Sequence, residues 1–326
     1  MAMSGTHVGF DGTPSAMRSS AAGNDGGDAV ILDSAPVGAA AIPDAIVNAM
    51  TVDVEDYFQV SAFAAHIDRA AWSEHAPRVE RNTDAVLALL EEACARATFF
   101  TLGWVAERYP ALIRRIVAAG HELASHGFAH IRVHEQSPAA FRDDVRRTKT
   151  LLEDVGGVAV TGYRAASFSI GADTLWAHEV LAEEGYLYSS SIYPIRHDLY
   201  GMPEAPRLPF LPDRTEDFVE CPLTTVRLLG RNLPCGGGGY FRLLPYIYSH
   251  WAMARFNRLE ARPCIFYFHP WEIDPDQPRQ RGVGWKTRFR HYTNLARMEG
   301  RLRRVLGDFS WDRMDRVFGI GPRGAA

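Results

Sequence analysis

The sequence predicts an α/β protein in which parallel strands alternate with helices. Apolar, β-rich runs recur along the chain, and most are followed by a stretch with helical periodicity. Four of these runs also end at a charged or titratable residue, namely Asp53, His126, Arg164 and His269. Functional side chains of parallel β/α folds lie at the carboxyl ends of the strands. We therefore expect these four side chains to meet at one end of the sheet.

The predicted elements follow one another with few interruptions up to about residue 190. We expect strands, in chain order, at 45–53, 97–102, 122–125, 158–163, 186–190 and 264–269. Periodicity and capping signals predict helices at 84–93, 111–119, 138–155, 172–184, 245–259 and 286–306. Ser137 and Pro138 illustrate such a signal, since serine is a common N-cap and proline suits the first helical turn.

The segment 194–245 differs from the rest of the chain. Seven of the 19 prolines fall between Pro194 and Pro234, and the glycine run 236–239 comes near its end. This composition predicts long loops and short strands over the mouth of the fold. The glycines form either a flexible loop or a place where the backbone approaches a ligand closely.

Composition excludes several classes of function. The net charge of the 326-residue chain is −4, with 35 basic and 39 acidic residues, which gives no reason to expect nucleic acid as a partner. No apolar run approaches the roughly 18–20 residues of a membrane span. The start of the chain carries no signal peptide, so we expect a cytoplasmic protein, with an extracytoplasmic location as the alternative.

Two histidines follow the strand predicted at 122–125. At the i, i+4 spacing of one turn, His126 and His130 would lie about 5–6 Å apart at Cβ, which allows both imidazoles to bind one divalent cation. Among 12 histidines such a pair also arises by chance. Asp53, Glu55 and Asp56 follow the first strand and would repel one another unless a cation or an arginine lies between them; otherwise they form a solvated acidic loop.

Together these motifs resemble the NodB-like polysaccharide deacetylases, carbohydrate esterases that remove acetyl groups from glycans. The motifs occur in the family's order and are Asp53, Ser125-His126 with His130, Gly162-Tyr-Arg164, Gly185-Tyr-x-Tyr-Ser-Ser-Ser and Phe268-His269. Asp53-Val-Glu-Asp-Tyr-Phe58, the glycine run before Tyr240 and Phe268-His-Pro-Trp-Glu-Ile-Asp274 resemble the branch found with exosortase and exopolysaccharide genes.

The resemblance implies a distorted (β/α) barrel with irregular loops over its mouth. It covers a deacetylase domain at 46–311, including a C-terminal extension from about residue 276. A disordered leader at 1–45 and a C-terminal tail at 312–326 would flank this domain.

The resemblance also implies a mechanism and a substrate. His126, His130 and one carboxylate would hold a divalent metal, most often zinc, Asp53 would be the catalytic base oriented by Arg164, and His269 would be the acid. A backbone N–H near residues 165–167 would bind the oxyanion. The implied substrate is an N-acetylated polysaccharide or oligosaccharide, with the exopolysaccharide biosynthesis machinery as a further partner. Candidate sugar-stacking residues are Tyr57, Tyr240 and Trp271.

Three positions depart from the family pattern. Val54 replaces the second aspartate of the first motif, and we prefer Glu55 to Asp56 as the metal ligand, because Glu55 points to the same side as Asp53 in an extended chain. Ser189 replaces an aspartate that tunes the acid histidine, and Glu272 or Asp274 is expected to supply that charge. The third motif continues as Ala165-Ala-Ser167 without the usual proline, which would alter the sugar platform.

Two alternative functions remain open at this stage. The same scaffold could serve an amidohydrolase acting on a small cyclic amide, since a fold does not determine a function. The chain could also be a non-catalytic glycan-binding protein. The presence of both the metal ligands and the acid–base pair argues against the second alternative.

Overall fold

The computed structural model describes residues 30–31, 46–198 and 200–321. The leader predicted at 1–45 lies outside the described residues except for the short strand β1 (Val30–Ile31). Within the described ranges, no helix is both long enough and apolar enough to cross a membrane.

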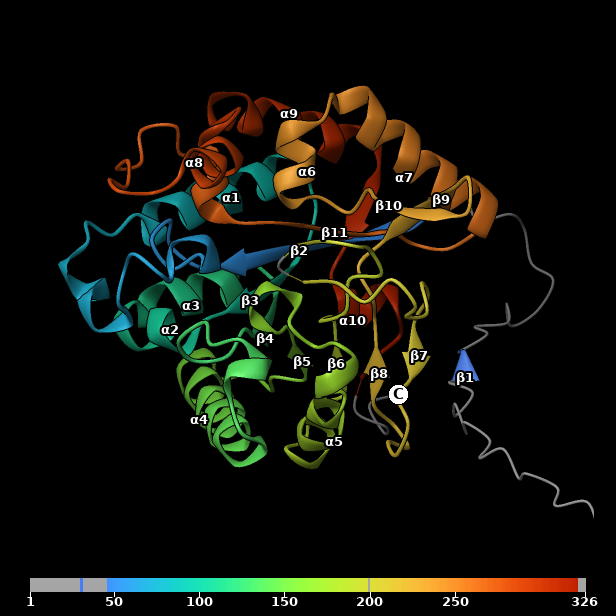
Figure 1. Cartoon of the computed structure of the whole chain (residues 1–326), viewed down its shortest axis with the longest axis horizontal. Coiled ribbons are helices and arrows are strands. Elements are labelled where there is room, and N and C mark those ends of the chain that lie inside the picture. Colours follow the sequence, from blue (N-terminus) through green and yellow to red (C-terminus); the bar gives the residue numbers. More distant parts are fainter. Residues whose placement is uncertain (1–29, 32–45, 199, 322–326) are drawn as a thin grey trace, which may run out of the picture.

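A curled, mostly parallel sheet organises the fold (Figure 1). Its strand order is β1-β7-β8-β6-β5-β4-β3-β2-β11, and β12 pairs with β2 beside this path. All pairs from β8 to β11 are parallel, whereas β7 and β1 add to the edge in antiparallel fashion. The strands are β2 (Val47–Val54), β3 (Thr98–Thr101), β4 (Glu122–Ser125), β5 (Gly162–Tyr163), β6 (Tyr188–Ser189), β7 (Phe210–Leu211), β8 (Val219–Glu220), β11 (Ile265–Phe268) and β12 (Ser310–Asp312). The predicted α/β class and distorted barrel are confirmed.

Irregular backbone, not a regular ladder, links β11 to the far strands of the barrel. The Tyr267 N–H donates to the Gly236 carbonyl at 2.7 Å, and the Ile265 N–H donates to the Thr224 hydroxyl at 2.7 Å. The adjacent Leu223 donates to the Ile192 carbonyl at 2.9 Å, just beyond β6. The hairpin β9 (Thr225–Leu228) and β10 (Arg231–Pro234) extends from this linking segment.

Helices surround the strands. In Figure 1, α4 and α5 lie on one side of the strand layer, and α7 and α9 lie on the other. The helices are α1 (Val79–Glu92), α2 (Gly103–Arg108), α3 (Pro110–Ala118), α4 (Pro138–Gly156), α5 (Trp176–Glu183), α6 (Gly238–Leu243), α7 (Tyr246–Glu260), α8 (Trp285–Tyr292), α9 (Leu295–Asp308) and α10 (Met314–Val317). Short 3₁₀ turns connect several of them.

Helix α1 begins at Val79, five residues before the start that we predicted. Its N-terminus is capped by Asp56, a residue far away in the sequence. One carboxylate oxygen of Asp56 accepts hydrogen bonds from the backbone N–H groups of Arg78 and Val79 at 2.7 and 2.9 Å. Local capping signals could not reveal this start, because the group that satisfies the free N–H donors comes from another element.

The prediction of a single helix at 286–306 is wrong, since α8 and α9 are separate helices. The helical conformation is interrupted at Asn294, whose φ of 60° lies in the left-handed region. The Asn294 side chain donates to the Arg242 carbonyl at 2.7 Å, and this hydrogen bond holds the residues between α8 and α9 against α6. Asparagine tolerates this conformation better than most residues.

Residues that we assigned to a C-terminal tail belong to the fold. Strand β12 pairs with β2, and Met314 in α10 is fully buried. The Met314 N–H donates to the Thr98 hydroxyl at 2.8 Å, at the amino end of β3. These residues therefore cover the end of the sheet opposite to the carboxyl ends.

The glycine run 236–239 allows close approach of two backbones, and the neighbour is β11 instead of a ligand. Gly237 has a φ of 108°, and a Cβ atom there would lie 2.0 Å from the Tyr267 carbonyl oxygen. Helix α6 starts directly after this contact. The glycines thus fix α6 against β11.

Gly237→Ala is expected to lower the free energy of unfolding by about 2–4 kcal/mol, because it combines a disfavoured φ with a backbone clash. Gly239→Ala is the matched control, since a Cβ there meets nothing within 4 Å; alanine inside a helix should be neutral or stabilise by up to about 1 kcal/mol. Urea unfolding of both variants tests this. Equal midpoints would contradict the proposed packing of α6.

Candidate active site

Side chains from distant parts of the chain meet at the carboxyl ends of the strands. They line a pocket of about 200 Å³ that includes Asp53, Glu55, His126, His130 and His269. Asp53 is the penultimate residue of β2, His126 follows β4 and His269 follows β11, so the parallel sheet itself brings them together. The predicted meeting point of the strand ends is thus present.

Arg164 lies beneath this pocket and is completely buried. Its Nη1 donates to Asp53 Oδ1 and to the Thr51 hydroxyl, each at 2.7 Å. Its Nε and Nη2 donate to the carbonyl and hydroxyl of Ser190 at 3.1 and 3.0 Å. The guanidinium also lies 4.1 Å from the centre of the Phe100 ring. A buried charge is tolerated only with such a full set of partners.

Glu55, His126 and His130 form a group that could hold a metal ion. Their ligand atoms all lie within 4.8 Å of one another, and all three residues are buried. The His130 Nε2 atom lies 3.0 Å from Glu55 Oε2. The left-handed backbone at His130, with φ of 50°, and at Gly127, with φ of 71°, turns the chain so that both imidazoles face Glu55.

The hydrogen bonds of His126 leave one ring nitrogen free to bind a cation. His126 Nδ1 lies 2.8 Å from the Arg164 carbonyl, which can only accept, so Nδ1 carries the proton and Nε2 is the free acceptor. Burial lowers the pKa of His126 and lowers that of His130 well below its usual value. Both imidazoles are therefore neutral at pH 7, as metal ligation requires.

Glu55 is the third member of the group. Its Oε1 accepts a hydrogen bond from the Trp271 indole at 3.2 Å. Its buried Oε2 accepts no hydrogen bond within the described ranges, although it lies beside His130 Nε2. Burial raises the pKa of Glu55 to about 7, partly offset by the charge of His269. A carboxylate with a free oxygen beside two neutral imidazoles fits a divalent cation, and two histidines with one carboxylate are typical of catalytic zinc sites.

Asp56, our alternative ligand, serves the fold instead. Besides capping α1, its other oxygen accepts the Tyr57 N–H at 2.8 Å. It is fully buried and does not belong to the Glu55–His126–His130 group. Glu55 therefore remains our predicted carboxylate ligand.

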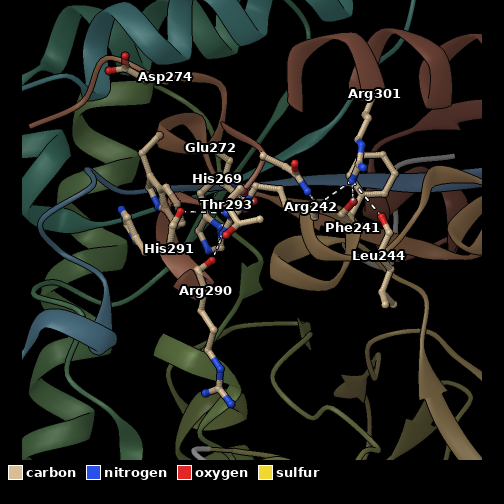
Figure 2. A network of polar contacts seen from close by, with 12 residues as sticks. Phe241, Arg242, Leu244, His269, Glu272, Asp274, Arg290, His291, Thr293 and Arg301 are labelled. Atoms are coloured by element: carbon tan, nitrogen blue, oxygen red, sulfur yellow. Dashed lines mark hydrogen bonds and ion pairs between the residues drawn. The ribbon is translucent and has the colours of Figure 1, made fainter. Parts of the chain in front are cut away.

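His269 is held by a chain of buried charges (Figure 2). Its Nδ1 lies 2.6 Å from Glu272 Oε1, and Glu272 Oε2 accepts from Arg242 Nε at 2.5 Å. Arg242 also donates to the carbonyls of Arg290, His291 and Thr293. Of the two acids that we expected to support His269, Glu272 makes the contact. Asp274 pairs with arginines near α1 instead.

This arrangement determines the protonation of His269. Burial disfavours the imidazolium, but the hydrogen bond and charge of Glu272, together with the charge of Glu55, raise the pKa of His269 to about 9. Burial likewise opposes the Glu272 carboxylate, yet Arg242 and His269 lower the pKa of Glu272 to about 2. His269 Nε2 faces the pocket, 3.8 Å from Asp53 Oδ2 and 3.6 Å from Glu55 Oε1.

The three residues proposed to stack on sugars lie in different environments. Tyr57 is buried and does not line the pocket, so that prediction is wrong. Trp271 lines the pocket, but His269 and His291 stack against its ring at 5.3 and 4.3 Å between centroids, which leaves no ring face for a sugar. Tyr240 is partly exposed and lines a neighbouring hollow.

Sequence reasoning missed the role of Trp271, which we had proposed as a sugar-stacking residue, and missed Ser61 altogether. The Trp271 indole donates to Glu55, and Ser61 lies 3.4 Å from His130 Nδ1 while accepting from Ser167 at 2.7 Å. Trp271 lies two residues after His269, and this proximity was the only signal available for it. Nothing in the sequence around Ser61 connects it with His130.

The family models match two adjacent segments of the chain. Residues 71–186 match the polysaccharide deacetylase model, and this segment contains His126, His130 and Arg164. Residues 190–319 match a "Domain of unknown function (DUF3473)", which contains Arg242 and His269.

Individual relatives match shorter parts. A chitooligosaccharide deacetylase of Bradyrhizobium sp. (strain ANU 289) is 33% identical over 100 residues, 31% of this chain and 43% of that protein. A peptidoglycan-N-acetylglucosamine deacetylase of Bacillus cereus is 30% identical over 77 residues, 24% of this chain and 28% of that protein. The chain thus spans less than half the length of these curated relatives.

One solved structure covers almost the whole fold. A candidate polysaccharide deacetylase from Mycobacterium smegmatis superposes with a TM-score of 0.57 at 21% sequence identity, covering 91% of this chain and 99% of that one. This similarity supports the distorted barrel.

The donor geometry leads to a prediction about metal content. Wild-type protein dialysed against zinc is expected to retain one cation per chain by elemental analysis, and His126→Ala is expected to retain none. Trp271→Phe removes the hydrogen bond to Glu55 and should weaken zinc binding about 10-fold. Asp56→Asn is the control that keeps full metal content. Loss of metal in Asp56→Asn but not in His126→Ala would overturn the assignment.

Proposed function

We propose that this chain, which contains a polysaccharide deacetylase domain at residues 71–186, hydrolyses the acetamido group of an N-acetylated glycan in a metal-dependent reaction. In this reaction water gives its hydroxyl to the acetyl carbon and its proton to the nitrogen, and the products are acetate and a free amine. The observation that carries the proposal is the meeting of three groups in one pocket: the Asp53–Arg164 pair, His269 and the Glu55–His126–His130 donors.

The proposed cation site consists of Glu55, His126 and His130. A divalent cation, with zinc favoured by the ligand types, would polarise the acetyl carbonyl and acidify the attacking water. The proton transfers of the reaction would be carried out by side chains of this protein.

Asp53 is the proposed base. Its Oδ1 is taken by Arg164, which leaves Oδ2 facing the pocket and His269. The buried guanidinium fixes the orientation of this carboxylate. Oδ2 would therefore take the proton of the attacking water.

His269 is the proposed acid. Because Glu272 occupies Nδ1, the Nε2–H of the imidazolium faces the pocket. It would give its proton to the departing nitrogen, while Glu272 and Arg242 keep the ring in place. Arg242 and Glu272 are positioning residues in this scheme, because they act through His269.

A backbone N–H near residues 165–167 is the proposed oxyanion donor. The Ala165 N–H already donates to the Ser191 hydroxyl at 2.8 Å, so it is not available. Ser167 lines the pocket and has a left-handed φ of 53°. Strained backbone of this kind is common at functional sites, and the Ser167 N–H is the better candidate.

We also propose that residues 46–321 act as one unit in exopolysaccharide biosynthesis, in contact with the biosynthetic machinery. The site needs β2 and β4 as well as α6 and β11, and the motifs around Asp53 and His269 resemble the exopolysaccharide-associated branch. Deletion of the gene should raise the N-acetyl content of the exopolysaccharide. An unchanged acetyl content would contradict this role.

Acetate release from N-acetylglucosamine oligomers tests the activity. We expect release by the zinc-loaded protein, loss of release with a chelator and a fall of about 10²–10⁴-fold in kcat for Asp53→Asn, because the base is removed. Asp53→Asn should keep its bound metal. Release that persists in chelator would contradict the mechanism. Tight binding of oligomers without any release would favour a glycan-binding protein.

The pH dependence of kcat/KM tests the acid. His269 must be protonated, so the rate should fall as pH rises through its pKa, which is about 9 before a cation binds. A bound cation lowers this pKa, because positive charge disfavours the imidazolium. Glu272→Gln removes the neighbouring negative charge and should move this limb further towards neutral pH. An unchanged limb in Glu272→Gln would exclude His269 as the titrating acid.

A further inference from the structure

We propose that a second hollow, next to the active-site pocket, binds acidic groups of the glycan, so that the substrate is an anionic N-acetylated polysaccharide. This inference rests on the proposed function, since it extends the same site along a polymer. The acidic groups would be carboxylates, as in uronic acids, or sulfate or phosphate esters.

The hollow has a volume of about 840 Å³. Its walls are the segments 194–196 and 203–208, the hairpin β9–β10 and Tyr240. Four arginines and one glutamate supply its charged side chains: Arg196, Glu204, Arg207, Arg227 and Arg231. The hollow is therefore strongly cationic, although the whole chain has a net charge of −4.

Three of these arginines have no acidic partner in the part of the chain that the structure describes. Arg207 is paired, because its Nη1 lies 3.0 Å from Glu260. Arg196, Arg227 and Arg231 are exposed, and within the described ranges no salt bridge involves them. Guanidinium groups that lack an internal carboxylate are available for an external one, which they can bind through two parallel hydrogen bonds.

Aromatic rings connect the hollow to the active-site pocket. Tyr200 lines the pocket, and its ring stacks on His197 with 4.0 Å between centroids. His197 in turn meets the edge of Tyr240, at 6.3 Å, and Tyr240 lines the hollow. Gly239, the residue before Tyr240, lines the active-site pocket. A polymer that places one acetamido group beside His269 can thus continue past Tyr240 towards the arginines.

This placement favours an acidic glycan over a neutral one. A neutral glycan gains little from three unpaired guanidinium groups, whereas an acidic one is also attracted towards the pocket by their field. The tip of the hairpin suggests an alternative ligand for the arginines, an anionic membrane, because Leu229 at this tip is 93% exposed. The geometry favours the glycan, since the arginines line a hollow that leads to the active site.

Binding measurements distinguish the acidic glycan from the membrane, and they do so independently of any catalytic activity. Isothermal titration in the presence of chelator compares hyaluronan hexasaccharide, in which N-acetylglucosamine alternates with glucuronate, with neutral N-acetylchitohexaose. A chondroitin sulfate hexasaccharide distinguishes sulfate esters from carboxylates. Arg227→Gln/Arg231→Gln removes two charges from the hollow. Arg114→Gln/Arg297→Gln is the matched control, with two exposed arginines on α3 and α9.

We expect tighter binding of hyaluronan than of chitohexaose at low salt and loss of this preference as screening increases. The hairpin variant should bind hyaluronan about 3- to 10-fold more weakly, as expected for two exposed ion pairs, while the control variant binds like wild type. Equal binding of both oligosaccharides, or an unaffected hairpin variant, would overturn the inference. So would binding to phosphatidylglycerol vesicles that depends on these arginines, without an oligosaccharide preference.

The outcomes are independent of the proposed activity. A preference for hyaluronan without acetate release would refute the deacetylase and leave the anionic site in place. Acetate release from neutral and acidic oligomers, without any difference in binding, would refute the anionic site alone.

Discussion

The buried Arg164–Asp53 pair is the interaction on which the rest of the site depends. Arg164 follows β5, and Asp53 is the penultimate residue of β2. The same guanidinium binds Thr51 on β2 and Ser190 beyond β6. Removing one member of a buried pair costs about 3–5 kcal/mol, because the other charge is left without a partner. The pair therefore fixes the spacing of the strand ends. It also fixes the orientation of Asp53, so that the oxygen not bound by Arg164 faces the pocket.

The two matched segments depend on each other at this site. The first supplies the histidine pair and Arg164, and the second supplies His269 and the positioning residues Glu272 and Arg242. Arg242 is anchored by carbonyls of residues 290–293, where α8 ends, and Arg301 on α9 donates to the carbonyls at the end of α6 (Figure 2). The C-terminal helices thus hold the acid histidine against the barrel.

Much of this arrangement could be predicted, because the carboxyl ends of parallel strands lie at the same edge of the sheet. The residue after each apolar run lies at a common edge, so Asp53, His126, Arg164 and His269 could be placed together before any coordinates were known. The unpaired oxygen of Glu55, its bond to Trp271 and the capping role of Asp56 could not be predicted, because each is decided by a partner far away in the sequence. The break at Asn294 was missed for the same reason.

The central claim is that Glu55, directly after β2, and the two histidines after β4 hold a single cation beside Asp53 and His269. Anomalous diffraction at the zinc edge, from crystals of zinc-loaded protein, tests it most directly. The account predicts one peak within about 2.0–2.2 Å of Glu55 and of the Nε2 atoms of His126 and His130. A peak at other side chains, or an ordered pocket without a peak, would contradict it.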